Sequence, residues 1–189
     1  GANRIGRSIA LELASYGVQI IIHYSKSFAS AKKLKIELEN LGSIVHLFKA
    51  DLNNFKQTQG IITYAYNKMK GLNCLVNNAS IFENDNLINF SEKSFLKHIN
   101  INLKAPAILI RDFAKKYKGK NGNIVNIIDQ RVEKLTPFFF SYTLSKSGLA
   151  TLTKTSAMKL APNIRVNAVS PGPTLKNKRQ SEKHFKKQW

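Results

Sequence analysis

The sequence predicts an α/β fold with a doubly wound parallel sheet and helices on both faces. Short apolar runs alternate with longer amphipathic stretches along the chain, which is the pattern of parallel strands joined by crossover helices. The run over 18–24 is continuous rather than alternating, so both faces of that strand are expected to be buried. With 189 residues, 43% of them hydrophobic, the chain is expected to form one domain over residues 1–189.

The expected elements follow in order from the loop at residues 1–7. A first helix ends at Gly17, where glycine is a good C-terminal signal. Pro106 lies inside a long helical stretch and should bend it. The charged tail 176–189 is expected to be either a lid over the site or simply solvated. Strands are expected over 18–24, 44–48, 74–77, 123–128 and 164–169, and helices over 28–41, 55–69, 91–117 and 143–160.

Composition limits the classes of partner. The net charge is +19, from 30 Lys and Arg against 11 Asp and Glu, which could indicate nucleic acid or an anionic membrane. The basic residues are scattered, however, so a composition bias explains them better and no specific nucleic-acid site is expected. No apolar run reaches the roughly 18 residues of a membrane span. The one cysteine, Cys74, excludes an internal disulfide and fits a cytoplasmic location.

Tyr142 and Lys146 form the first candidate catalytic pair. Four positions apart on a helix, they share one face. A neighbouring ammonium favours the phenolate, so it is expected to lower the pKa of the phenol and let it transfer a proton. Taken alone, the same spacing also fits an ordinary surface helix.

The amino-terminal half carries a candidate dinucleotide site. Gly1 and Gly6 flank a turn that leads into a helix N-terminus, whose backbone N–H groups and dipole suit a phosphate. NAD-binding folds usually place an acid after the second strand to hold the ribose 2′-hydroxyl. No acid stands in the run His23, Tyr24, Ser25, Lys26. Lys26 and the loop residue Arg4 could meet a 2′-phosphate instead, which favours NADP(H) over NAD.

These motifs together resemble the short-chain dehydrogenase/reductase family, which has a Rossmann-type fold, and within it the pteridine reductases. The resemblance covers essentially the whole chain and rests on seven motifs in family order. They are Arg4-Ile5-Gly6, His23-Tyr24, Asp51-Leu52, Asn77-Asn78-Ala79-Ser80, Asn102 with Ala105-Pro106, Tyr142 with Lys146, and Arg165-Val166-Asn167-Ala168-Val169 leading to Pro171-Gly172.

The resemblance implies a role for each matching residue. Tyr142 resembles the proton donor, and Lys146 resembles the residue that lowers the tyrosine pKa and holds the nicotinamide ribose. Asn102 resembles the anchor of a water-linked proton relay, although it could also satisfy the backbone at the Pro106 bend. The remaining implied cofactor contacts are Arg4, Ile5, Gly6, His23, Tyr24, Ser25, Lys26, Asp51 and Leu52 near the adenosine end, and Asn78, Ala79, Ser80, Pro171 and Gly172 nearer the nicotinamide.

Asp129 departs from the general family pattern, because it stands where the family's catalytic serine is usual. An ionised carboxylate cannot donate a hydrogen bond to a carbonyl. Pteridine reductases, by resemblance, carry Asp here and pair it with the tyrosine to protonate the pterin. Phe82 resembles the aromatic on which the pterin stacks, although it could be an ordinary loop hydrophobe.

The resemblance therefore implies an NADPH-dependent reductase of a pterin or dihydrofolate-like C=N bond. A carbonyl reductase acting on a 3-oxoacyl thioester remains the alternative, and a non-catalytic basic nucleic-acid-binding protein is a weaker one. The chain is expected to lack the family's first strand and its C-terminal end. The family also implies a homo-oligomer, commonly a tetramer, and a small-molecule substrate with no membrane partner.

Overall fold

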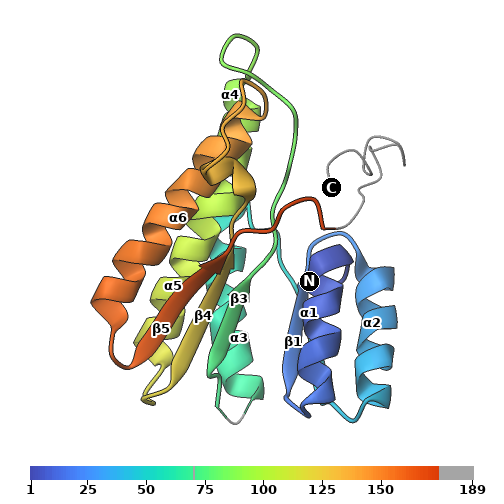
Figure 1. The fold of residues 1–189 in the computed structure, drawn as a ribbon. Helices are drawn as coiled ribbons and strands as arrows, with labels where there is room; N and C mark the ends of the chain where they lie inside the picture. Colours follow the sequence, from blue (N-terminus) through green and yellow to red (C-terminus); the bar gives the residue numbers. More distant parts are fainter. Residues whose placement is uncertain (70, 175–189) are drawn as a thin grey trace.

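The chain alternates strands and helices as expected, in a computed structural model that describes residues 1–69 and 71–174. Figure 1 shows the order of the elements. The tail at 176–189 lies outside the described residues. The strands are β1 Ile20–Tyr24, β2 Val45–Lys49, β3 Cys74–Asn77, β4 Gly122–Ile127 and β5 Ile164–Val169; the α-helices are α1 Arg4–Ser15, α2 Phe28–Asn40, α3 Phe55–Lys68, α4 Glu92–Ile99, α5 Ala105–Lys116 and α6 Phe140–Leu160.

Glycines end the first two helices, as the sequence predicts for Gly17. Gly17 and Gly42 have φ angles of +69° and +87°, in the left-handed region that costs other residues steric strain. The sequence misplaced the start of α6, however. It was expected at residue 143, and it begins at Phe140. None of the helices in the described part of the chain is long and apolar enough to cross a membrane.

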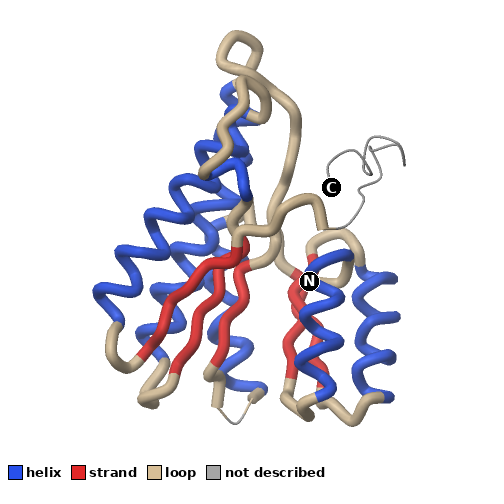
Figure 2. Tube along the Cα trace, in the orientation of Figure 1, coloured by secondary structure: helices blue, strands red, loops and turns tan. Residues whose placement is uncertain are grey.

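All strand pairs are parallel, which confirms the predicted fold class. The pairing divides the described strands into two sheets, β1-β2 and β3-β4-β5. Ile20 pairs with Val45 in the first sheet, and Val76 pairs with Val125 in the second. Figure 2 shows the two sheets side by side, with α1 in front of the first sheet and α3 and α5 behind the second. The single predicted sheet is thus present in two parts.

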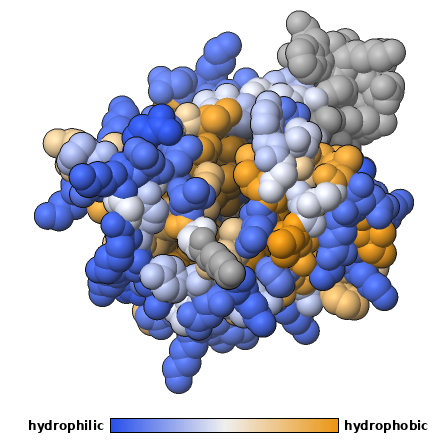
Figure 3. Space-filling view, turned by 90° about the horizontal axis from the view of Figure 1, so that it is seen from below, coloured by the Kyte–Doolittle hydropathy of each residue, from blue (hydrophilic) through white to orange (hydrophobic). Residues whose placement is uncertain are grey.

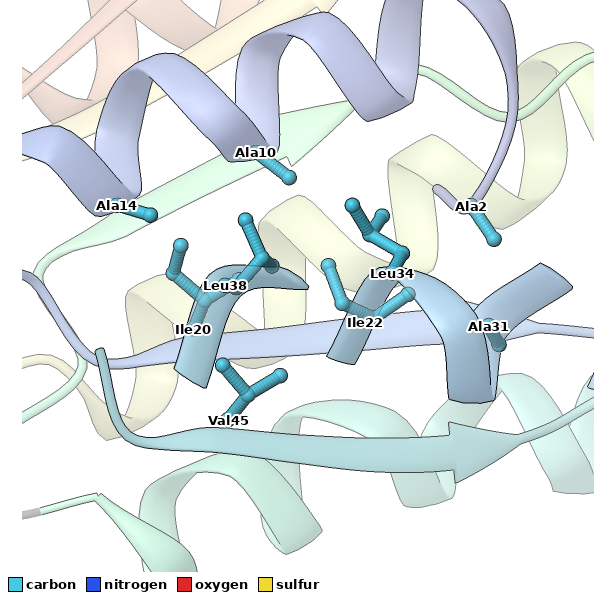
Figure 4. Packing of buried hydrophobic residues seen from close by; sticks show 9 residues of the cluster. All are labelled: Ala2, Ala10, Ala14, Ile20, Ile22, Ala31, Leu34, Leu38 and Val45. Carbon is cyan, nitrogen blue, oxygen red and sulfur yellow. The ribbon is translucent and has the colours of Figure 1, made fainter. Parts of the chain in front are cut away.

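Each sheet has its own hydrophobic core. Small alanines on α1 and α2 let these helices approach β1 and β2 closely, and larger side chains such as Leu34 and Leu38 fill the space between them (Figure 4). The second core joins α3, α5 and α6 to the other sheet around Phe113 and Ile124, which are 1% and 0% exposed. The two cores hold the carboxyl ends of the strands along one edge.

An apolar slot separates the two sheets. This cavity of about 260 Å³ lies between β1 and β3 and is also lined by residues of α1, α3 and α5. Among its lining side chains are Ile20, Ile62 and Leu75. Seen from below, apolar side chains gather around the hollow between the two halves of the molecule (Figure 3).

The long helix predicted over residues 91–117 is present. Where the sequence predicts a bend near Pro106, the helix has a wider, π-helical turn. A π-helical segment, Asn100–Lys104, joins α4 to α5. Pro106 has no N–H to donate to the carbonyl of residue 102, so the ordinary ladder is interrupted here. The amide of Ala105 instead bonds the carbonyl of Asn100, five residues back. The wide turn positions Asn102, which is fully buried.

Candidate functional site

Most of the predicted site residues meet in one cavity at the carboxyl ends of the strands. It has a volume of about 380 Å³ and lies where β4 ends and α6 begins. Polar groups from the first loop, the loop after β3 and the loop after β5 face it. The predicted residues that line it are Arg4, Ile5, Gly6, Asn78, Ala79, Ser80, Phe82, Asp129, Tyr142, Lys146, Pro171 and Gly172.

Tyr142 and Asp129 are in direct contact. The Tyr142 hydroxyl donates a hydrogen bond of 2.8 Å to Oδ2 of Asp129. The second carboxylate oxygen, Oδ1, accepts the backbone N–H of Arg131 at 2.9 Å. Asp129 follows β4, and its carboxylate begins the short 3₁₀ helix Gln130–Val132. A side chain anchored in this way holds the phenol in a fixed direction.

The electrostatics of Tyr142 differ from the sequence-based expectation. Burial and the Asp129 carboxylate raise the pKa of Tyr142 well above its ordinary value, and the positive charge of Arg131 opposes the shift only in part. The expectation that a cation lowers this pKa is therefore wrong for the cofactor-free protein. The physical reason is that the phenol hydrogen-bonds an anion in a desolvated place, so its neutral form is favoured.

Lys146 lies beneath the phenol rather than beside its hydroxyl. Its ammonium is 5.7 Å from the centre of the Tyr142 ring and donates a 2.6 Å hydrogen bond to the carbonyl of Ile127. Burial lowers the pKa of Lys146 to about 8, although the Asp129 carboxylate opposes this shift. The side chain is 2% exposed, so this ammonium is held by the end of β4.

Asn102 supports the site from behind. Its side-chain oxygen accepts the N–H of Ile81, and its amide nitrogen donates to the carbonyl of Ile81 and to the Ser145 hydroxyl, all at 2.9–3.0 Å. Ser145 in turn donates to the carbonyl of Tyr142 at 2.7 Å. Asn102 therefore joins the loop after β3 to the first turns of α6; the backbone that its side chain satisfies is that of Ile81, not that of the Pro106 bend.

An aromatic wall stands beside the Tyr142 ring. The rings of Phe82 and Phe139 stack with centres 4.2 Å apart and planes 5° apart, and Phe82 meets the Tyr142 ring edge-on at 4.7 Å. The guanidinium of Arg131 lies 4.6 Å from the Phe139 ring centre and 5.6 Å from that of Phe82. Phe82 thus lines the cavity as a flat apolar surface with a cation next to it.

The glycine turn is packed too closely for any side chain at Gly6. A Cβ there would lie 2.6 Å from the side-chain nitrogen Nδ2 of Asn78 and 2.8 Å from the backbone carbonyl oxygen of Gly1. The turn leads into α1, whose N-terminus faces the cavity with Arg4 and Ile5. A bare backbone cradle at a helix N-terminus is the arrangement that binds phosphate groups.

The residues predicted for the adenosine end are not all gathered in the cavity. Of these, Arg4, Ile5 and Gly6 line it, while His23 and Leu52 line the apolar slot. The ring of His23 meets the carbonyl of Ala50 at 2.9 Å, and burial lowers the pKa of this histidine. Other predicted residues lie outside the lining of this cavity; they are Tyr24, Ser25, Lys26 and Asp51.

Three residues near the reacting groups escaped the sequence analysis. Arg131 follows Asp129 by two positions, and a charged residue just after a strand was a usable signal. Ser145 and Phe139 gave no such signal in the sequence. The role of Ser145 depends on its hydrogen bond with Asn102, and the position of Phe139 depends on its backbone φ of 59°. These features arise from the packing of segments that are distant in sequence.

The comparisons with known proteins agree over almost the whole chain. A family model described as short chain dehydrogenase matches residues 1–187. A 3-oxoacyl-[acyl-carrier-protein] reductase of Synechocystis sp. is 30% identical over 175 residues, which are 91% of this chain and 71% of the relative.

Two solved structures are similar in fold and in sequence. The FolM alternative dihydrofolate reductase 1 of Brucella canis, complexed with NADP, superposes with a TM-score of 0.94 at 40% identity and covers 99% of this chain and 74% of its own. Its counterpart from Brucella suis, also in complex with NADP, gives 0.93 at 40% identity, with coverage of 99% and 75%. The likeness therefore includes both sheets and the loops around the cavity.

Proposed function

Since the chain belongs to the short-chain dehydrogenase family, we propose that it is an NADPH-dependent reductase of a pterin or dihydrofolate-like C=N bond. The observation that carries the proposal is the 2.8 Å hydrogen bond from Tyr142 to Asp129, formed next to the stacked rings of Phe82 and Phe139. A proton donor, its acidic partner and a flat aromatic platform lie in one cavity.

The residues present fit NADP(H). The glycine cradle at Gly6 is closed to any Cβ, which suits a pyrophosphate against backbone N–H groups. Arg4 and Lys26 would supply positive charge for the 2′-phosphate, in keeping with the NADP bound in the two Brucella structures. Lys146 would hold ribose hydroxyls, and Asn78, Ala79 and the Pro171-Gly172 turn would line the nicotinamide end. When bound, the cofactor supplies the hydride.

The protein's part in the reaction is to deliver a proton. The raised pKa keeps Tyr142 protonated, which is the state a donor needs before a reduction. A basic ring nitrogen of the substrate next to the hydroxyl would compete with Asp129 for this proton. The carboxylate would orient the donor and take part in resupplying the proton, while Asn102 could anchor a water from behind.

The substrate class follows from the acid and the aromatic wall. A serine in place of Asp129 would donate a hydrogen bond to a carbonyl oxygen, whereas an ionised carboxylate accepts hydrogen bonds. Pterin and folate rings carry N–H and amino donors that a carboxylate can accept, and their flat rings can stack on Phe82.

One observation favours a second candidate, reduction of a 3-oxoacyl thioester. The Synechocystis relative at 30% identity is named as such a reductase. The carboxylate of Asp129 argues against it, because this carboxylate would repel the oxyanion that develops on a reduced carbonyl.

The test is NADPH oxidation, followed at 340 nm, with dihydropterins, dihydrofolate and oxoacyl thioesters. We expect turnover of the first two classes and little of the third. Asp129→Ser should depress pterin reduction while leaving thioester reduction unchanged or better. Pterin turnover close to wild type in Asp129→Ser would overturn the pterin assignment and leave only the broader reductase.

We also expect a cytoplasmic homo-oligomer, a tetramer by family resemblance, with no specific nucleic-acid partner. Light scattering would give the mass of the assembly. Any binding to DNA should be weak and steeply salt-dependent.

A further inference from the structure

The helix that carries Tyr142 begins without a cap of its own. Its N-cap residue is Phe139, whose side chain cannot accept a hydrogen bond and whose backbone is left-handed, with φ 59° and ψ 41°. The first N–H groups of any α-helix lack partners within the helix. Ser, Thr, Asn or Asp usually accepts one of them from the N-cap position.

Asp85 supplies the cap from the loop after β3. Its Oδ1 accepts the N–H of Ser141 at 3.1 Å, and its backbone carbonyl accepts the N–H of Phe140 at 3.4 Å. Asp85 is 6% exposed, so this carboxylate is buried against the positive end of the helix dipole. Its other oxygen, Oδ2, has no hydrogen-bond partner among the described residues.

The loop that carries Asp85 is fixed at alternate residues. Ile81 is held by Asn102, and Glu83 is held by the His98 ring at 3.3 Å and by Lys97 at 2.8 Å. Asp85 is the third fixed point. Phe82 lies between the first two and contacts Phe139 and Tyr142. In Figure 1 this loop rises from β3 toward the upper ends of α4 and α6.

We propose that Asp85 is a positioning residue, which caps α6 from the loop after β3 and thereby fixes the Tyr142 hydroxyl relative to the Phe82 platform. This role rests on the proposed function. Tyr142 is the residue after Ser141, whose N–H Asp85 accepts, so a frayed first turn would move the phenol away from Asp129. It would also release Phe139 from Phe82. The Tyr142 hydroxyl and the Phe82 ring would then no longer be held at a fixed distance from each other.

The experiment compares Asp85→Ala, Asp85→Asn and Asn86→Ala. Asp85→Asn keeps an oxygen that can accept the Ser141 N–H. Asn86→Ala is the matched control in the same loop, because Asn86 Oδ1 accepts the N–H groups of Ile88 and Asn89, which belong to the loop itself. Each variant is assayed for dihydropterin reduction with NADPH, and NADPH affinity is measured by calorimetry.

For Asp85→Ala we expect at least a tenfold loss of kcat/KM, about 1.4 kcal/mol of transition-state stabilisation. NADPH affinity should stay within about threefold, because Lys146 is held separately by Ile127. Asp85→Asn should recover most of the activity, and Asn86→Ala should stay within about threefold of wild type. Equal losses in all three variants would show that the loop acts only by its general stability and would overturn the proposal, as would full activity in Asp85→Ala.

Hydrogen exchange separates this proposal from the function on which it rests. The Ser141 amide should exchange faster in Asp85→Ala than in wild type, while amides in the later turns of α6 keep their protection. This readout needs no substrate, so it decides the cap even if wild type reduces no pterin. Unchanged exchange at Ser141 would refute the cap, whereas an inactive wild type with a protected Ser141 would refute only the proposed function.

Discussion

Replacing Lys146 with methionine should change how the stability of the protein depends on pH. Burial lowers the pKa of Lys146 from 10.5 to about 8, which corresponds to roughly 3 kcal/mol of disfavoured charge at neutral pH. Between these two pKa values, the unfolded chain holds a proton on this lysine that the native chain has released. The unfolding free energy therefore rises with pH across this window.

The magnitude can be followed over a narrower range. From pH 8 to pH 9.5 the contribution of Lys146 should be about 1.6 kcal/mol, less than the full 1.4 kcal/mol per pH unit because the native lysine is still half protonated at pH 8. This range also lies below the ordinary pKa of tyrosine. Methionine has a similar length and no charge, so Lys146→Met should lack this rise. Its absolute stability also includes the lost hydrogen bond to Ile127, and the informative quantity is therefore the slope.

The assay is urea unfolding followed by circular dichroism at pH 7, 8 and 9.5, on wild type and variant without cofactor. Lys154→Met is the control, because Lys154 is an exposed lysine on the same helix. Its curve should run parallel to that of wild type. Parallel curves for wild type and Lys146→Met would refute the reasoning, because a lysine with an ordinary pKa contributes no slope in this range.

Three further outcomes follow from the site. Tyr142→Phe should lower pterin turnover by about 10²–10⁴-fold, the usual worth of a positioned acid, with NADPH binding retained in calorimetry; turnover within tenfold of wild type would remove Tyr142 as the donor. Gly6→Ala should weaken NADPH binding at least tenfold, because the added methyl would lie 2.6 Å from the Asn78 amide, and equal affinity would show that the turn can yield. In Asp129→Ser the pKa of Tyr142 should fall, because a carboxylate that raises it is lost. The pKa is measured by following phenolate absorbance as the pH is raised. If Tyr142 ionises at the same pH in the variant as in wild type, Asp129 does not raise its pKa.

The sequence predicts the helices and strands well because their signals are local. Three consecutive isoleucines mark β1, and the glycines at 17 and 42 end their helices through positive φ angles. The start of α6 was misplaced for the opposite reason, since Phe139 is a poor N-cap. The partner that makes the helix start possible, Asp85, is distant in sequence.

The sequence predicted which residues form the candidate site, but not which partners these residues contact. Tyr142, Lys146 and Asp129 were identified from spacing and family resemblance, and they do line one cavity. The direction of the Tyr142 pKa shift was predicted wrongly, because a sequence does not reveal which charge the hydroxyl contacts. Asp129 accepts its hydrogen bond, while the ammonium of Lys146 is held by Ile127.

The apolar slot between β1 and β3 also affects how this chain behaves in solution. None of the described strands pairs with the facing edges of β1 and β3, and the hollow between them is lined mainly by aliphatic side chains. Unpaired strand edges beside apolar surface are templates for intermolecular β-pairing. Handled as a 189-residue polypeptide, the chain should therefore bind hydrophobic dyes and self-associate increasingly with concentration. A short extended peptide of branched aliphatic residues should suppress both effects.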